Sequence, residues 1–322
     1  MNRPKLETTF KLERDPAPLV VNDFNVSVFR ILNWYQNKIE GSFSPEVEEK
    51  LIKGAFALDT NRGPDMLPRH SYRILFVADC RYSDTGNYWR NTFMTKSPEV
   101  SQAWTNYAES KRVPLSSLPT SYKGQRSDKT DAFWTVYKIC RDYAEEYFPF
   151  FTHEGYEADD IAGAIYRLSR DSGPESVATK RQILLQTIDR DWSQLVDEEH
   201  KVYFANTRVP FPNEVIQERL VGNQGVIEHT AHRMGFDLDH PKNLADWKVL
   251  HGDMGDNLPP GSPKCLFDLC EPNDDYNIEK VAPWFPDLVE CVNDPKANDR
   301  PDHWDTTIRQ FAKIALEAPV RW

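Results

Sequence analysis

The chain has 322 residues, of which 39% are hydrophobic and 28% are charged, and its formal net charge is −11. Its apolar residues are spread along the chain, and no run approaches the ~20 residues of a membrane helix, so we expect no membrane partner. The start of the chain is polar and charged, unlike a secretory signal, which favours a cytoplasmic protein.

The cysteine pattern points away from both disulfides and zinc. The five cysteines are an odd number and include no C-x-x-C pair, which fits a reducing compartment. They are Cys80, Cys140, Cys265, Cys270 and Cys291.

Short apolar runs alternate with helical patterns along the first two thirds of the chain. Residues 131–148 and 158–170 have apolar positions every three or four residues, as amphipathic helices do. Buried strands are predicted at residues 18–24, 72–79, 181–189 and, more weakly, 201–207. This alternation predicts an α/β fold with a mainly parallel central sheet flanked by helices.

Two regions depart from this pattern. Residues 81–129 read as neither strand nor clear helix, and they contain four aromatic residues near their start, including Tyr82 and Tyr88. From residue 81 to 141 there are ten Lys or Arg against five Asp or Glu, so this part is locally basic despite the acidic net charge. Long irregular insertions in compact domains are often functional loops. After about residue 208, helical patterns replace strands, which predicts a smaller helical module at residues 208–322.

Acidic residues fall where the predicted strands end and where helices begin. The nine acids are Asp23, Asp79, Glu157, Asp159, Asp160, Asp189, Asp191, Asp253 and Asp256. Because the carboxyl ends of parallel strands meet at one edge of a sheet, these acids are expected to lie close together. Taken singly, each also reads as a helix cap or a turn residue.

Carboxylates brought together repel each other and require a compensating cation. The predicted cluster offers only oxygen ligands, without His or Cys, so it favours Mg²⁺, with Mn²⁺ as a substitute, over zinc. A cluster of this size suits two ions roughly 4 Å apart, as in phosphodiester cleavage.

Three motifs resemble those of the 5′ nuclease family, which includes flap endonucleases and the 5′ exonuclease domains of bacterial DNA polymerases. These are "YEADD", "TIDRDWSQLV" and "HGDMGDNLPPG", in the family's order and approximate spacing. "VVNDFNVSVFR", "LFVADCRYSDTGNYWR" and "YKGQR" also fit, and "YWRNTF" looks most like the ribonuclease H of T-even phages. The resemblance spans roughly residues 19–264.

The resemblance implies a PIN-like metal-dependent nuclease domain at residues 1–207, with an arch at about 81–129. Residues 208–322 would form a helix-three-turn-helix module that binds duplex DNA, with a C-terminal extension after it. The implied ligands are Asp23, Asp79, Glu157 and Asp159 for one metal ion, and Asp189, Asp191 and Asp256 for the other. Asp160 and Asp253 match acidic positions further from the ions.

The resemblance also implies residues that contact nucleic acid. Arg90 and Lys123 match the basic pair that reaches the scissile phosphate from the arch, and Arg126 would contact the DNA backbone. Tyr82 and Tyr88 are candidates for stacking on an unpaired base. Lys264 is a candidate phosphate contact.

This chain departs from the family pattern at two places. The family usually has a longer glycine-rich turn where this chain has "LPPGSPK", so a K⁺ ion in the helical module stays open. The gap between Arg90 and Lys123 is longer than in the phage relatives, which predicts a larger arch or an inserted helix and loop.

From the sequence we expect a Mg²⁺-dependent 5′-to-3′ exonuclease or flap endonuclease that removes RNA primers or 5′ flaps from duplex DNA. The phage-like motifs predict a virus-encoded monomer for replication and repair. Its partners would be a flapped duplex or an RNA–DNA hybrid, and a single-strand-binding protein or sliding clamp. Two alternatives stay open, a PIN-type endoribonuclease and a catalytically inactive structure-specific DNA-binding protein.

Overall fold

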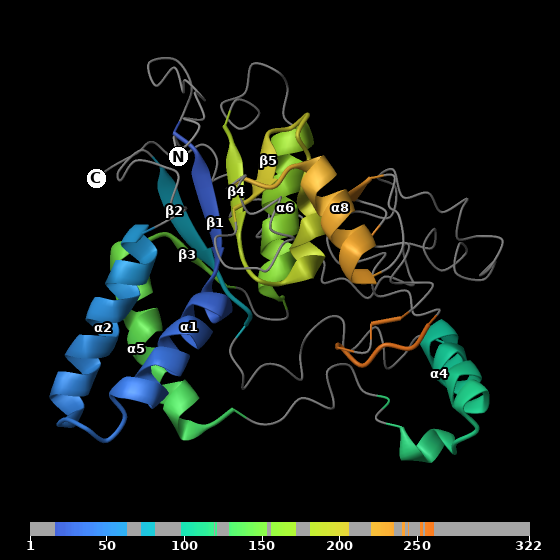
Figure 1. The fold of residues 1–322 in the computed structure, drawn as a ribbon, viewed down its shortest axis with the longest axis horizontal. Coiled ribbons are helices and arrows are strands. Elements are labelled where there is room, and N and C mark those ends of the chain that lie inside the picture. Colours follow the sequence, from blue (N-terminus) through green and yellow to red (C-terminus); the bar gives the residue numbers. More distant parts are fainter. Residues whose placement is uncertain are drawn as a thin grey trace, which may run out of the picture.

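A five-stranded parallel sheet forms the centre of the molecule, with the strand order β3-β2-β1-β4-β5 (Figure 1). The strands are β1 (Leu19–Asp23), β2 (Arg73–Val77), β3 (Phe150–Phe151), β4 (Ile183–Gln186) and β5 (Val202–Phe204). The predicted α/β fold with a mainly parallel central sheet is therefore confirmed. All four predicted strands are present. Strand β3 was not predicted, because two residues are too few to show a pattern.

The computed structural model describes most of this domain and part of the chain after residue 207. The described residues are 17–62, 72–80, 98–118, 120, 129–152, 156–171, 181–205, 220–234, 240–241, 244, 252–253 and 255–260. None of the helices within these ranges is both long enough and apolar enough to cross a membrane.

Strand β1 is the central strand and fixes the register of its two neighbours. Val20 lies opposite Ile74 on β2 and opposite Leu184 on β4. Its last residues lie opposite the last residues of both neighbours, so three strands end at one edge of the sheet. Every residue of β1 is buried, as expected for a parallel strand with both faces covered.

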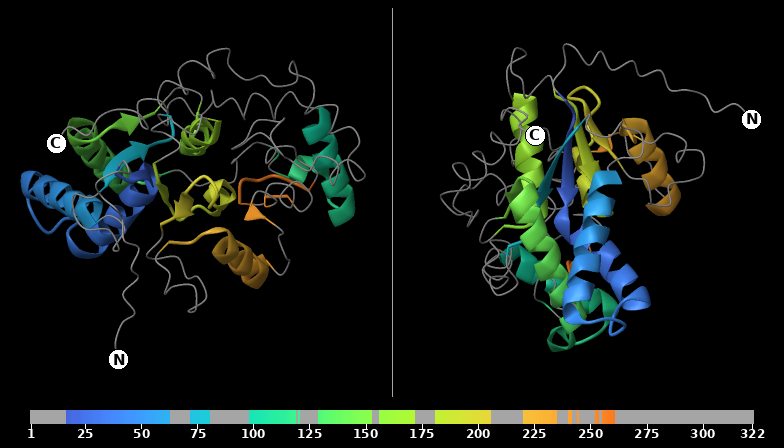
Figure 2. Two further views of the ribbon diagram at one scale, coloured as in Figure 1. Left: turned by 90° about the horizontal axis from the view of Figure 1, so that it is seen from above. Right: turned by 90° about the vertical axis from the view of Figure 1, so that its left-hand side faces the viewer.

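Helices cover both faces of the sheet (Figures 1 and 2). The helices α1 (Phe24–Lys38), α2 (Pro45–Arg62) and α5 (Asp131–Tyr147) pack against one another and share a core with one face. Helix α6 (Ala158–Asp171) lies on the other side of the sheet, and α8 (Asn223–Met234) lies beyond the edge strand β5. The predicted helices at 131–148 and 158–170 are thus confirmed, whereas α1 and α2 were not predicted.

The core between the sheet and α1, α2 and α5 is built around one phenylalanine. Phe24 is fully buried, and its ring makes edge contacts with the rings of Phe56, Phe76, Tyr137 and Phe150, at centroid distances of 5.0 to 6.0 Å. Edge contacts of this kind stabilise beyond the area they bury. Phe24 therefore joins two strands to all three helices of this layer.

The interpretation of residues 81–129 as neither strand nor clear helix is wrong for part of this segment. Helix α4 (Pro98–Lys111) and the 3₁₀ helix η2 (Leu115–Ser117) lie within it. Ala103, Trp104 and Ala108 form the buried side of α4, and their spacing of one and four residues is a helical signal. The many Ser and Thr residues of the segment obscured this pattern.

Helix α8 is the described part of the predicted helical module. It is linked to the sheet by an isolated bridge between Phe204 and Val221 and by the Glu198 carboxylate, which accepts from the Asn223 amide at 2.8 Å. A side-chain oxygen that accepts from a first-turn amide caps a helix. The division of the chain near residue 207 and the helix-three-turn-helix arrangement stay predictions.

We expect Phe24→Ala to lower the free energy of unfolding by about 3–5 kcal/mol, because it leaves a cavity among four aromatic rings. Phe43→Ala, at a side chain that is 52% exposed, is the matched control and should cost less than about 0.5 kcal/mol. Urea denaturation of the full chain measures both. Equal losses in the two variants would contradict the central role of Phe24.

Candidate metal centre

Acidic residues mark the carboxyl edge of the sheet. Asp23 is the last residue of β1, Asp79 lies two residues after β2, and Asp189 lies three residues after β4. Helix α1 begins at this edge directly after Asp23. The strand-end acids thus share one edge, as the parallel sheet predicts.

Asp23 is a buried carboxylate in a repulsive environment. It is 7% exposed, accepts from the Thr187 hydroxyl at 2.8 Å, and caps α1 by accepting from the Val26 amide at 3.4 Å. Burial raises the pKa of Asp23 to about 7, and the nearby carboxylates of Asp79 and Asp189 contribute in the same direction. The two hydrogen bonds lower that pKa but do not offset burial and repulsion.

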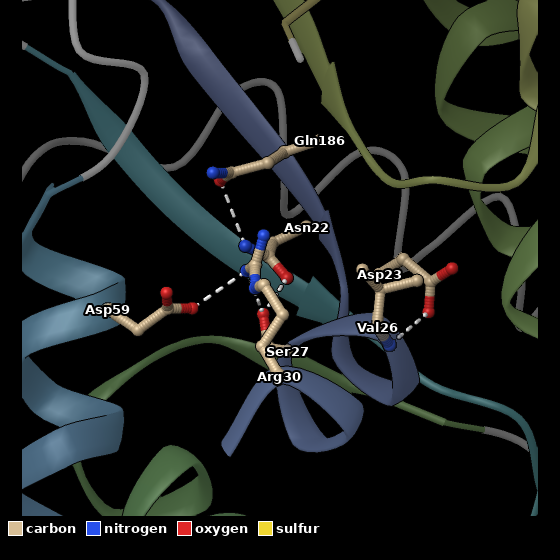
Figure 3. A network of polar contacts seen from close by, with 7 residues as sticks. All are labelled: Asn22, Asp23, Val26, Ser27, Arg30, Asp59 and Gln186. Carbon is tan, nitrogen blue, oxygen red and sulfur yellow. Dashed lines mark hydrogen bonds and ion pairs between the residues drawn. The ribbon is translucent and has the colours of Figure 1, made fainter. Parts of the chain in front are cut away.

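A polar chain behind Asp23 holds the ends of β1 and β4 together (Figure 3). The Asn22 side-chain Nδ2 donates to Gln186 Oε1 at 2.9 Å, and the Ser27 hydroxyl donates to Asn22 Oδ1 at 2.9 Å. Arg30 donates to the Ser27 hydroxyl and pairs with Asp59 of α2 at 2.7 Å. These contacts fix the direction in which α1 leaves the sheet, and therefore the place of Asp23.

Asp79 connects the two helices that begin near the acidic edge. Its Oδ2 accepts from the Asn25 side chain at 2.8 Å, and its Oδ1 accepts from the Ala158 amide at 2.9 Å. The second contact caps the first turn of α6 from outside that helix. Asp79 therefore has a structural role in addition to its predicted one.

Three of the nine acids lie at the start of α6, and their surroundings differ. Asp160 is fully buried and accepts from the Glu157 amide at 2.9 Å, so it is used in capping the helix. Glu157 is 1% exposed. Asp159 Oδ1 accepts from the indole N–H of Trp192 at 2.7 Å, and this contact joins α6 to the segment after β4.

That segment is the 3₁₀ helix η3 (Arg190–Leu195). Asp189 caps it, because its Oδ1 accepts from the Asp191 amide at 2.9 Å. The Asp189 amide in turn donates to the Thr187 hydroxyl at 3.0 Å, so Thr187 connects this turn with Asp23. Asp191 is 6% exposed.

The loop at residues 252–260 brings in the last two acids. Asp253 and Leu258 form a bridge through two backbone hydrogen bonds, and the Asp253 carboxylate accepts from the Gly255 amide at 3.1 Å. Gly252 adopts a positive φ of 77°, and a Cβ there would lie 2.6 Å from the Leu258 carbonyl oxygen. Glycine at 252 is therefore required for this tight turn.

Three of the nine acids form a compact group. One oxygen from each of Asp191, Asp253 and Asp256 lies within 4.8 Å of the other two, and among the described residues this is the group suited to a metal ion. A set of carboxylate oxygens without nitrogen or sulfur ligands fits a hard divalent cation. Outside these three residues, the carboxylates of Asp79 and Asp189 add to the effect of burial in raising the pKa of Asp23.

The structure thus joins the nine predicted acids by contacts of different kinds. Asp253, expected further from the ions, lies in the compact group with Asp191 and Asp256. Asp189 interacts with Asp23 instead, and Asp159 and Asp160 contact Trp192 and the start of α6. The ligand assignment stays a prediction.

The predicted nucleic-acid contacts lie outside the described residues. These are Tyr82, Tyr88, Arg90, Lys123, Arg126 and Lys264. Three residues that contact the acids were not singled out from the sequence, Asn25, Thr187 and Trp192. Each lies within two residues of a predicted ligand in the chain, and that proximity is the signal that could have revealed them.

Part of the chain matches a known family of nucleases. Residues 95–229 match the family model described as 5'-3' exonuclease, N-terminal resolvase-like domain. This segment includes five of the nine acids, and both α6 and η3. The predicted similarity to 5′ nucleases is confirmed for residues 95–229, whereas the closeness to the ribonuclease H of T-even phages stays a prediction.

Named relatives agree with this family. The chain is 28% identical over 142 residues to a 5'-3' exonuclease of Mycoplasmopsis pulmonis, a match covering 44% of this chain and 40% of that protein. It is 27% identical over 143 residues to DNA polymerase I of Chloroflexus aurantiacus, covering 44% of this chain and 13% of that protein. The matched part thus spans less than half the length of either relative.

Solved structures of phage T5 proteins also align with the chain. One is a T5 flap endonuclease in a pseudo-enzyme-product complex with DNA and metal ions, at 16% identity and a TM-score of 0.45, covering 92% of this chain and 99% of that one. Another is a mutant T5 5′-exonuclease at 16% identity and a TM-score of 0.43, covering 93% of this chain and 100% of that one.

The raised pKa of Asp23 predicts a pH dependence of stability in EDTA. The pKa of Asp23 is about 7 in the folded protein and about 4 in the unfolded chain, so the folded state binds the proton more tightly. The protein therefore loses stability as the pH rises from about 4 to 7, by at most about 4 kcal/mol. Asn caps helices as well as Asp does, so Asp23→Asn should be more stable than the native chain at pH 8. Thermal unfolding at pH 5 and pH 8 measures this difference.

Asp142→Asn is the control for that comparison, because it makes the same charge change at an exposed position of α5. It should leave the pH dependence unchanged. An Asp23→Asn variant that loses stability between pH 5 and pH 8 as steeply as the native chain would contradict the pKa assignment.

Gly252→Ala should disrupt the turn that carries Asp253 and Asp256, because its Cβ would collide with backbone atoms at 2.6 to 2.8 Å. We expect Mn²⁺ affinity, measured by electron paramagnetic resonance, to fall by about tenfold or more. Gly54→Ala, where a Cβ meets open space in α2, is the control and should stabilise by about 0.5–1 kcal/mol. Unchanged Mn²⁺ affinity in Gly252→Ala would show that this turn plays no part in metal binding.

Proposed function

We propose that this chain is a divalent-metal-dependent 5′ nuclease that hydrolyses phosphodiester bonds at 5′ ends or 5′ flaps of duplex DNA, including RNA primers. The observation that carries this proposal is the compact group of Asp191, Asp253 and Asp256. The family match of residues 95–229 supports it, since that segment contains Asp191.

The donor set supports Mg²⁺ as the physiological cation. Carboxylate oxygens are the ligands that Mg²⁺ prefers, and they favour it over zinc, which usually takes nitrogen or sulfur ligands. When bound, such cations supply a water of lowered pKa and neutralise charge on the phosphate. The remaining acids would complete a second position, as the resemblance implies for Asp23, Asp79, Glu157 and Asp159.

The chain's own residues prepare the site before substrate binds. Thr187 and Asn25 orient the carboxylates of Asp23 and Asp79 by donating hydrogen bonds. The backbone amides at the start of α6 and η3 stabilise further negative charge. Preorganised donors of this kind avoid the cost of reorienting the site during the reaction.

The basic segment between β2 and α5 is proposed as the arch that binds the substrate. Its helix α4 lies on the side of the molecule where the loop at 252–260 lies, in both views (Figures 1 and 2). Arg90 and Lys123 would stabilise the scissile phosphate, and Tyr82 and Tyr88 would stack on an unpaired base. The helical module with α8 would bind the duplex.

Cleavage of a 5′-labelled flapped DNA duplex, with Mg²⁺ or with EDTA, tests this function. We expect Mg²⁺-dependent products with 5′-phosphates, and Asp191→Asn should lower kcat by about two orders of magnitude or more while retaining DNA binding. Asp142→Asn should cleave at the native rate.

Two other outcomes would replace the proposal. Cleavage of single-stranded RNA with no cleavage of the flapped duplex would identify a PIN-type endoribonuclease. Binding of the flap without cleavage in Mg²⁺ or Mn²⁺ would identify a DNA-binding protein.

A further inference from the structure

Trp192 contacts one of the predicted metal ligands from the centre of the protein. Its side chain is fully buried, and its indole Nε1–H donates to Asp159 Oδ1 at 2.7 Å. That distance is at the short end for N–H···O hydrogen bonds and is typical of a charged acceptor. An indole N–H donates and never accepts, so the Asp159 oxygen is the acceptor in this contact.

This contact joins two segments that each carry acids of the candidate site. Asp159 lies in the first turn of α6, and Trp192 comes directly after Asp191 in η3. The hydrogen bond therefore links the Asp159 carboxylate to the turn that carries a member of the compact three-acid group.

A second contact joins the same two parts of the chain further along α6. The Tyr166 hydroxyl donates to Asp197 Oδ2 at 3.0 Å, and His200 Nδ1 lies 2.7 Å from the same oxygen. Tyr166 and Asp197 are 1% and 5% exposed. Seven residues separate Asp159 from Tyr166, or about two helical turns, so α6 is held at two points on one side. A helix held in this way cannot rotate about its axis, and the direction of Asp159 is fixed.

We propose that Trp192 is a positioning residue for the metal centre: its indole N–H holds the Asp159 carboxylate oriented relative to Asp191 before a divalent cation binds. This proposal rests on the proposed function of the same site. It adds a residue that does not itself bind the cation or the substrate but acts through Asp159.

Packing alone would not require this arrangement. A buried position beside α6 could be filled by Phe or Leu, which need no hydrogen-bond partner, whereas a buried indole N–H must find one. The acceptor here is a predicted metal ligand rather than a backbone carbonyl. Partners that orient a metal ligand typically contribute 10- to 100-fold to metal affinity.

The test replaces the donor and keeps the shape. Incorporation of 3-benzothienylalanine at position 192 substitutes sulfur for the N–H group in a ring of nearly the same size, and Trp192→Phe provides a second variant. The same two changes at Trp134, a partly buried residue of α5 that packs against the core on the other side of the sheet, are the matched controls. The readouts are Mn²⁺ affinity of the full chain without DNA, and kcat and KM for the flapped duplex.

We expect both variants at position 192 to bind Mn²⁺ about 10- to 100-fold more weakly than the native chain. Their kcat should fall, whereas KM for DNA should stay within about twofold of the native value. A general structural defect would weaken DNA binding as well as metal binding, so this difference identifies a positioning role. The variants at position 134 should match the native protein in all three quantities. Thermal unfolding identifies any variant that fails to fold, and the benzothienyl variant keeps the test decisive if Trp192→Phe does fail.

Two results would overturn the proposal while the proposed function stands. One is native Mn²⁺ affinity in the folded benzothienyl variant, and the other is an equal loss in the variants at position 134. A native chain that neither binds Mn²⁺ nor cleaves the flap would instead reject the proposed function, and the role of Trp192 with it.

Discussion

Mutual repulsion among carboxylates at one edge of a parallel sheet is the constraint on which this structure depends. Asp23 lies at the end of the central, fully buried strand, where water cannot screen its interaction with Asp79 and Asp189. Folding without a cation therefore costs free energy at neutral pH. The pKa of Asp23 is raised first by burial and then by repulsion from Asp79 and Asp189, and it reflects that cost. A site that is unfavourable when empty is well suited to bind a cation, because the ligand relieves the repulsion.

The acids are held in place by hydrogen bonds that also build the fold. Asp23 caps α1, Asp189 caps η3, and Asp160 and Asp79 accept from amides at the start of α6. Capping and metal binding were alternative interpretations of these residues, and the contacts confirm the capping. A carboxylate oxygen has more than one lone pair, so a capping carboxylate can also bind a cation. Their capping roles therefore do not argue against the proposed chemistry.

Stability and the candidate site are coupled through two adjacent residues, Asp23 at the end of β1 and Phe24 at the start of α1. Phe24 forms the centre of the aromatic core, and Asp23 immediately before it belongs to the acidic edge. The polar chain from Gln186 through Asn22 and Ser27 fixes the same turn from the other side of the strand (Figure 3). The packing of the core is thus what holds the position of a predicted ligand against the repulsion of its neighbours.

The sequence alone determined the parallel sheet, four of its strands, the helices at residues 131–148 and 158–170, the acids and their common edge. These features arise from local periodicity and from the rule that parallel strands end together. It also indicated the nuclease family, through motifs in a fixed order. The apolar positions of α1, at Phe24, Val28, Ile31 and Tyr35, carry a helical signal that the dominant strand before them masked.

Only the tertiary structure decided which acids meet. Asp191 joins Asp253 and Asp256 across more than sixty residues of chain, and Trp192 reaches Asp159 from another element. No local pattern encodes such contacts, because they depend on how the turn at Gly252 packs beside the element that carries Asp191. Local sequence specifies where each acid lies along its own element, whereas the packing of the elements specifies the distances between them.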